Sequence, residues 1–144
     1  MESLDFLLPQ LSLGGVEITR DLAENLPEVM GDRIRIEQVF LNLLANAMQA
    51  MEESVEKRLS LKTFLSGDRE RSVVIEVADT GKGFTPEVKR KLFTPFFTTK
   101  KVGHGTGLGL SISLNIVKDH KGGIEARGEP EKGAVFTIRL PIHQ

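Results

Sequence analysis

Cysteine is absent from this 144-residue sequence. Its absence excludes disulfide bonds, thiolate zinc sites and thiol catalysis, and it suits a reducing compartment. No apolar run approaches the roughly 18 residues that a membrane-spanning helix needs, and residues 1–3 do not begin a signal peptide. We therefore expect a cytoplasmic domain that makes no contact with a membrane.

An excess of charge of either sign is also missing. The 19 basic and 20 acidic residues leave a net charge of −1, which excludes a general attraction to nucleic acid or to anionic lipid. No linker rich in proline or serine divides the chain, and 40% of its residues are hydrophobic, enough for a sizeable core. The sequence thus predicts one domain over residues 1–144.

The commoner nucleotide-binding motifs are lacking as well. There is no Gly-x-x-x-x-Gly-Lys-Ser/Thr loop, and no Gly-x-Gly-x-x-Gly follows a predicted strand. The His-Arg-Asp and Asp-Phe-Gly signatures of protein kinases are also absent. If this chain binds ATP, it does so with a different fold.

Hydrophobic periodicity predicts the helices. The longest extends from residue 33 to about residue 53, where apolar residues recur at three- and four-residue steps on one face. A second helix is expected over residues 107–120, ending at a glycine pair, and short helices over residues 4–13 and 86–92. The long helix must pack against another apolar surface.

Alternating patterns predict five strands, over residues 16–19, 59–65, 72–77, 124–127 and 134–140. The polar turn at residues 66–69 joins two of them into a hairpin, and the last two strands form a second hairpin. The predicted fold class is α+β, a two-layer α/β sandwich in which helices cover one face of a mixed sheet of about five strands.

Three stretches rich in glycine or aromatic residues, 79–84, 93–97 and 103–110, occur in order along the chain. The last opens directly into the predicted helix, so its backbone N–H groups can converge on an anion such as phosphate. Residues 94–106 show no periodicity, and we expect them to form a mobile lid. Together these stretches predict a nucleotide pocket.

Asn42 and Asn46 are four residues apart, so both project from one side of the long helix. A hard cation such as Mg²⁺ accepts amide oxygens together with phosphate oxygens and water, which makes the pair a candidate metal site. The alternative is that the two amides only form hydrogen bonds with neighbouring loops. The pair alone does not decide between these possibilities.

Asp79 stands at a strand end, before Gly81-x-Gly83. A buried carboxylate there can accept a hydrogen bond from the amine of adenine, and it would repel the carbonyl that guanine presents at the same point. An ordinary turn aspartate is one alternative. Another is the Asp-Thr-Gly triplet of retroviral-type aspartic proteases, which the long helix disfavours because those enzymes are nearly all β.

Four ordered motifs carry a resemblance to bacterial sensor histidine kinases. They resemble the N, G1, F and G2 boxes of that family: Gln38-x-x-x-Asn42-Leu43-Leu44-x-Asn46-Ala47, Asp79-x-Gly81-x-Gly83, Phe93-x-Pro95-Phe96-Phe97 and Gly105-Thr106-Gly107-Leu108-Gly109-Leu110. Residues 133–136 resemble the final glycine motif, and residues 96–100 look most like the nitrogen-regulatory subgroup. The resemblance implies the catalytic ATP-binding domain, with the Bergerat fold shared by gyrase, Hsp90 and MutL.

This resemblance also implies roles for individual residues. Asn46 would be the principal Mg²⁺ ligand with Asn42 beside it, and Asp79 would bind adenine, helped by the G1 glycines. The lid hinge and triphosphate loop would contain Gly105, Thr106, Gly107, Leu108 and Gly109, and Lys100 would contact phosphate or remain a solvated lid residue. The chain departs from the family at Gln49, where many members carry lysine, and at Ala134, where threonine is typical.

Asn42 also bears on the type of reaction. Hydrolysing members of the superfamily carry glutamate at this position, and a carboxylate can activate water whereas an amide cannot. The resemblance therefore implies that Mg·ATP donates its γ-phosphoryl group to a histidine on a separate dimerisation and phosphoacceptor domain, and through it to a response regulator. None of His104, His120 and His143 resembles that acceptor, and the domain by itself should be monomeric. An ATPase or a nucleotide-dependent switch remains the alternative.

Overall fold

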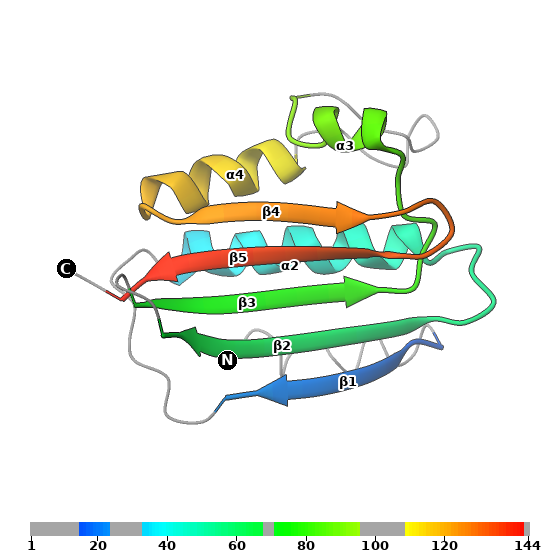
Figure 1. The fold of residues 1–144 in the computed structure, drawn as a ribbon, viewed down its shortest axis with the longest axis horizontal. Helices are drawn as coiled ribbons and strands as arrows, with labels where there is room; N and C mark the ends of the chain where they lie inside the picture. The colour runs from blue at the N-terminus through cyan, green and yellow to red at the C-terminus, as the bar shows by residue number, and fades with distance from the viewer. Residues whose placement is uncertain (1–14, 24–32, 68–70, 96–108, 143–144) are drawn as a thin grey trace.

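The computed structural model describes residues 15–23, 33–67, 71–95 and 109–142. Its five strands form one sheet, in the order β1-β2-β3-β5-β4. Their bounds are β1 (Glu17–Leu22), β2 (Arg58–Ser66), β3 (Ser72–Asp79), β4 (Gly123–Gly128) and β5 (Ala134–Pro141). β1 pairs with β2 in parallel and the other neighbours are antiparallel, so the predicted mixed sheet with two hairpins is confirmed (Figure 1).

Side-chain alternation decides which face of the sheet is buried. In β2 the side chains of Leu59, Leu61 and Thr63 are buried, whereas those of the residues between them are exposed. β3 lies at the centre of the sheet and is buried along most of its length. One face of the sheet is therefore apolar and must be covered by helices.

Three helices are described: α2 (Arg33–Ala50), α3 (Pro86–Lys91) and α4 (Gly109–Asp119). α2 and α4 lie side by side and pack on the same sheet (Figure 1). The buried side chains of both helices and of the sheet form one core cluster, which includes Phe40, Leu43, Val117, Phe136 and Ile138. The predicted two-layer α+β fold is confirmed.

The predicted end of the long helix, at residue 53, is wrong, because α2 ends at Ala50. The carbonyl of Ala50 accepts a hydrogen bond from the backbone N–H of Lys82, at 3.0 Å. The following residues form tighter turns, in which Ser54 N–H donates to the Met51 carbonyl at 2.9 Å. A loop that is distant in sequence thus terminates the helix.

Other boundaries differ by a few residues. β1 begins one residue later than predicted and extends to Leu22, and β3 extends to Asp79. The helix expected over residues 86–92 is α3, which Thr85 caps by accepting a hydrogen bond from the Val88 N–H. The helix predicted over residues 4–13 and most of the predicted lid, residues 96–106, lie outside the described residues. Within the described ranges, no helix has both the length and the apolar character required to cross a bilayer.

Candidate functional site

Three elements carry the candidate polar groups that the structure describes. β3 ends with Asp79, the second half of α2 carries Asn42 and Asn46, and α4 begins with Gly109. In Figure 1 the arrowhead of β3 and the last turn of α2 lie toward the right, and the first turn of α4 is the end of that helix nearer to them. Asn42 contacts the start of α4, and the loop after Asp79 contacts Ala50 at the end of α2, so both sets of candidate residues adjoin the same helix.

Asp79 is the last residue of β3, and only 7% of its surface is exposed. Its Oδ1 accepts a hydrogen bond from the Gly81 N–H at 2.8 Å. Burial raises the pKa of the carboxyl above its ordinary value of 3.8, and hydrogen bonds from the backbone of Gly81 and Ala134 lower it by less. When ionised, this carboxylate is a pure acceptor that could take a hydrogen bond from an exocyclic amine.

The two glycines after Asp79 are required by packing. A Cβ on Gly81 would lie 2.5 Å from the Ala50 carbonyl oxygen, and one on Gly83 would lie 1.9 Å from the Glu129 carbonyl oxygen. Gly83 also has a φ of +63°, which strains any side chain other than hydrogen. The loop is thus held between the end of α2 and the β4–β5 connection.

Two residues that the sequence analysis gave no role also support this loop. Thr80 Oγ1 donates to the Glu56 carbonyl at 2.8 Å and accepts from the Arg58 N–H at 3.0 Å. Gly133 has a φ of +80°, and a Cβ there would lie 2.1 Å from the Asp79 carbonyl oxygen. The only sequence signal for Gly133 was its place in the final glycine motif.

Asn42 is half-buried and contacts both its own helix and α4. Its Nδ2 donates to the Gly109 carbonyl at 3.1 Å and to Ser113 Oγ at 3.2 Å. Its Oδ1 accepts from Gln38 Nε2 at 2.8 Å. Ser113 is completely buried, and its only sequence signal was a hydroxyl within an apolar helical pattern. Hydrogen bonding to neighbours, the alternative role for this amide, is therefore present at Asn42.

The described residues fit a Mg²⁺ ion that takes most of its coordination from a bound nucleotide and from water. Among the described residues, no group of three or more His, Cys, Asp or Glu side chains could hold a metal. Mg²⁺ at nucleotide sites takes only one or two protein ligands and completes its shell with phosphate oxygens and water. Asn46 is half-buried one turn beyond Asn42 on α2, and its amide oxygen is of the type that such an ion accepts.

The remaining candidates belong to the predicted lid and triphosphate loop. Lys100, Gly105, Thr106, Gly107 and Leu108 all lie outside the described residues, and of the G2 box only the last two positions, Gly109 and Leu110, are described.

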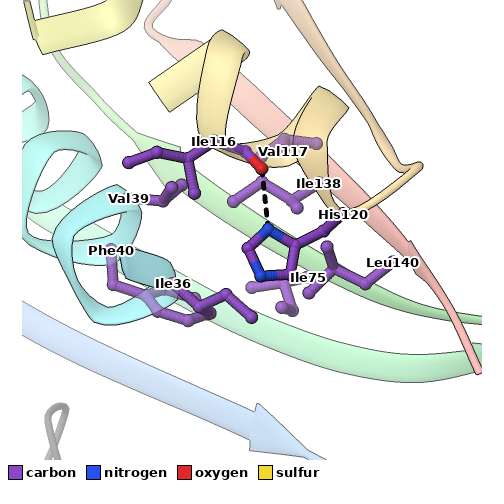
Figure 2. A pocket seen from close by; sticks show the side chains of 9 residues that line it. All are labelled: Ile36, Val39, Phe40, Ile75, Ile116, Val117, His120, Ile138 and Leu140. Carbon is purple, nitrogen blue, oxygen red and sulfur yellow. Dashed lines mark hydrogen bonds between the residues drawn. The ribbon is translucent and has the colours of Figure 1, made fainter. Parts of the chain in front are cut away.

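A small hollow lies between the first half of α2, the end of α4 and the sheet. Figure 2 shows His120 pointing among apolar side chains from α2, α4 and the sheet. The cavity measures only about 10 Å³, enough for about one water molecule. His120 Nδ1 donates to the Ile116 carbonyl at 2.8 Å, so this ring is bonded within its own helix. This hollow is an incompletely filled part of the core and lies apart from the candidate site.

Comparison with known proteins identifies the family. Residues 31–144 match the family described as histidine kinase-, DNA gyrase B-, and HSP90-like ATPase. The chain belongs to this family. The family and the fold together exclude the aspartic protease alternative.

Relatives within the family are sensor kinases. The chain is 35% identical over 143 residues to sporulation kinase E of Bacillus subtilis (strain 168), an alignment that covers 99% of this chain and 19% of that protein. The chain therefore spans about a fifth of the length of that relative. It is also 43% identical over 120 residues to sensor histidine kinase ZraS of Salmonella typhimurium, covering 83% of this chain and 24% of that protein, so the resemblance to the sensor histidine kinases is confirmed.

Solved structures agree with this assignment. The catalytic domain of histidine kinase ThkA superposes with a TM-score of 0.81 at 30% identity, covering 99% of this chain and 91% of that one. Histidine kinase ThkA in complex with the response regulator protein TrrA gives a TM-score of 0.76 at 29% identity, covering 97% of this chain and 38% of that one. The predicted fold is thus that of a histidine kinase catalytic domain.

Proposed function

We propose that this domain binds Mg·ATP and donates the γ-phosphoryl group to a histidine on a separate dimerisation and phosphoacceptor domain. The observation that carries the proposal is the position of Asp79, buried at the end of β3 and followed by a glycine loop that packs on the end of α2, the helix that carries Asn46. One end of that arrangement suits adenine and the other suits phosphate.

Asp79 would select the base. Its carboxylate accepts hydrogen bonds and donates none, so it suits the amine of adenine and repels the carbonyl of guanine. Hydrogen bonds to charged groups contribute roughly 1.5–3 kcal/mol, enough to discriminate the two bases at least tenfold. The donor that holds Asp79 Oδ1 is the backbone N–H of Gly81, which is fixed by the loop and has no rotamers of its own.

The phosphates would lie toward the start of α4. Unpaired N–H groups at a helix N-terminus bind anions, and α4 follows the predicted triphosphate loop directly. Asn46 would hold Mg²⁺, which neutralises phosphate charge when bound. These groups position and polarise the nucleotide, and phosphoryl transfer depends mainly on such positioning and electrostatics.

The amide and the hydrogen bonds of Asn42 favour phosphoryl transfer to an external acceptor over hydrolysis. Both of its N–H groups are directed to α4, and its oxygen accepts from Gln38, so the side chain offers no base for activating water. Within the described residues His120 lies at the other end of α4, against apolar side chains (Figure 2). The acceptor histidine would therefore come from another domain.

The same proposal specifies partners and compartment. The domain would work in the cytoplasm, where ATP is available. The phosphorylated histidine of its partner domain would then pass the phosphoryl group to a response regulator. The similar kinase ThkA has been solved in complex with the response regulator protein TrrA, which supports this order of partners. By itself the domain would be a monomer, since dimer contacts would belong to the partner domain.

Calorimetric titration tests the binding step. With Mg²⁺ present, ATP should bind and GTP should not. Asp79→Asn should abolish measurable ATP binding in a variant whose circular dichroism is unchanged, while Asp21→Asn, the same change at an exposed position on β1, should bind normally. Unchanged ATP affinity in folded Asp79→Asn would refute the adenine assignment.

Radiolabel transfer tests the reaction. The isolated domain should neither label itself with γ-phosphate nor hydrolyse ATP rapidly. Addition of the matching dimerisation domain should transfer the label to a histidine of that domain, and Asn46→Ala should stop the transfer by removing the metal ligand. Rapid hydrolysis by the domain alone would favour the ATPase alternative, and a stable label on its own histidines would contradict the proposal.

A further inference from the structure

We propose that Asn42 is a positioning residue, whose amide fixes the first turn of α4 against α2 and so sets where the phosphate-binding end of α4 lies. The inference rests on the proposed function, and it assigns Asn42 a role other than that of metal ligand. It follows from three hydrogen bonds that this side chain makes with described residues.

The orientation of the Asn42 amide is fixed by its neighbours. The Gly109 carbonyl can only accept, so the group 3.1 Å from it must be the amide nitrogen. A flipped amide would bring two acceptor oxygens together at that distance. The oxygen therefore faces Gln38, on the same helix, with one of its lone pairs in use.

The two bonds donated by Asn42 engage both ends of one helical turn. Gly109 is the first residue of α4 and Ser113 is four residues later, the spacing at which an α-helix closes its own hydrogen bond. Ser113 is completely buried, so its hydroxyl depends on such internal partners. Asn42 thus holds the whole first turn rather than a single atom.

Hydrogen bonds, more than tight packing, set the position of α4 at this point. A Cβ added to Gly109 would lie 3.8 Å from Asn42 Cγ, an ordinary van der Waals contact, so steric crowding does not fix the distance between the two helices here. Hydrogen-bond strength falls steeply with distance and angle, and the N–H groups of α4 must meet phosphate oxygens within a few tenths of an ångström. A carboxylate at position 42 would face the Gly109 carbonyl with like charge, so amide chemistry is required.

Nucleotide affinity measured in EDTA separates positioning from metal binding. Asn42→Ala and Ser113→Ala should each weaken ADP binding about three- to tenfold without any metal, the range expected for one lost hydrogen bond. The fold-loss of ADP affinity in the double variant should be smaller than the product of the two single fold-losses, because both changes break the same contact. The matched controls are Asn115→Ala, exposed on α4, and Ser60→Ala, exposed on β2.

A comparison of adenosine with ADP, by competition against a fluorescent ADP derivative, excludes a purely structural effect. Displacement of α4 should weaken the affinity for ADP and leave the affinity for adenosine unchanged. Loss of folded protein would instead lower the apparent binding of both ligands in proportion. Ser113→Ala keeps the inference testable even where Asn42→Ala does not fold.

Equal ADP affinity of the wild type, Asn42→Ala and Ser113→Ala in EDTA would overturn the inference while leaving the proposed function intact. An effect of Asn42→Ala that appears only with Mg²⁺, with Ser113→Ala unchanged, would return Asn42 to the role of metal ligand. Failure of the wild type to bind ADP or ATP at all would refute the proposed function and this inference with it.

Discussion

The two ends of the α2–α4 layer are built on different principles. At the candidate site the chain holds a buried carboxyl, a half-buried hydrogen-bonded amide and a glycine that packs against other backbone, as at Asp79, Asn42 and Gly83. At the far end the same helices meet the sheet through side chains such as Phe40 and Ile138, around a nearly filled apolar hollow (Figure 2).

This difference determines what each end tolerates. Apolar side chains of about the right volume can replace one another with modest cost, because dispersion and water exclusion have no direction. Hydrogen bonds and backbone contacts require particular atoms in particular places. We therefore expect substitutions at the far end to change mainly stability and substitutions at the candidate site to change mainly binding. Some residues of the site should favour binding while lowering the free energy of unfolding.

The largest expected effect is at the far end. Phe40→Ala removes a fully buried ring and should lower the free energy of unfolding by about 3–5 kcal/mol. Urea denaturation would measure this, and ADP affinity, corrected for the folded fraction, should stay within about twofold of the wild type. Phe40→Leu, which preserves most of the volume, should lose much less stability. A large change in corrected affinity would show that the two ends are coupled.

A change at the loop after Asp79 should come next. Gly83→Ala should cost about 3 kcal/mol, because it adds a left-handed backbone penalty to a clash with the Glu129 carbonyl. Gly15→Ala is the control, since Gly15 has a φ of +78° but open space around it, and should cost only about 1–2 kcal/mol. Denaturation of both variants measures the two contributions separately. Equal losses of stability in the two variants would mean that the loop around Gly83 can shift away from the Glu129 carbonyl, so that the close contact is not required.

The smallest effect concerns the pH dependence of Asp79. Burial raises its pKa above 3.8, so its neutral form favours the folded state, and that contribution is present below pH 3.8 and lost as pH rises through the folded-state pKa. Asp79→Asn cannot ionise. Its free energy of unfolding should therefore improve relative to that of the wild type between pH 3.5 and pH 7, as urea titrations at each pH would show.

Asp21→Asn, at an exposed site, provides the comparison for this pH series. A difference between wild type and Asp79→Asn that stays constant over the whole range would mean that the buried carboxyl imposes no stability cost. A difference that grows with pH, together with lost ATP binding, would show that this residue is retained for binding at the expense of stability.

The sequence by itself determined the order and type of the elements. Periodicity along α2 and alternation along β2 and β3 are local properties, imposed by the repeat of each structure and the need to bury one face. The ordered motifs around Asn42, Asp79 and Gly109 likewise identified the family, because they combine particular residues at fixed positions in the chain.

Tertiary structure alone decided how those residues are used. The end of α2 at Ala50 depends on the Lys82 N–H, the amide of Asn42 is directed by Gly109 and Ser113, and Gly133 is required by its contact with the Asp79 carbonyl. Each of these partners is distant in sequence. A hydrogen bond or a steric contact depends on a distance between two atoms, and that distance exists only once the helices and the sheet have packed.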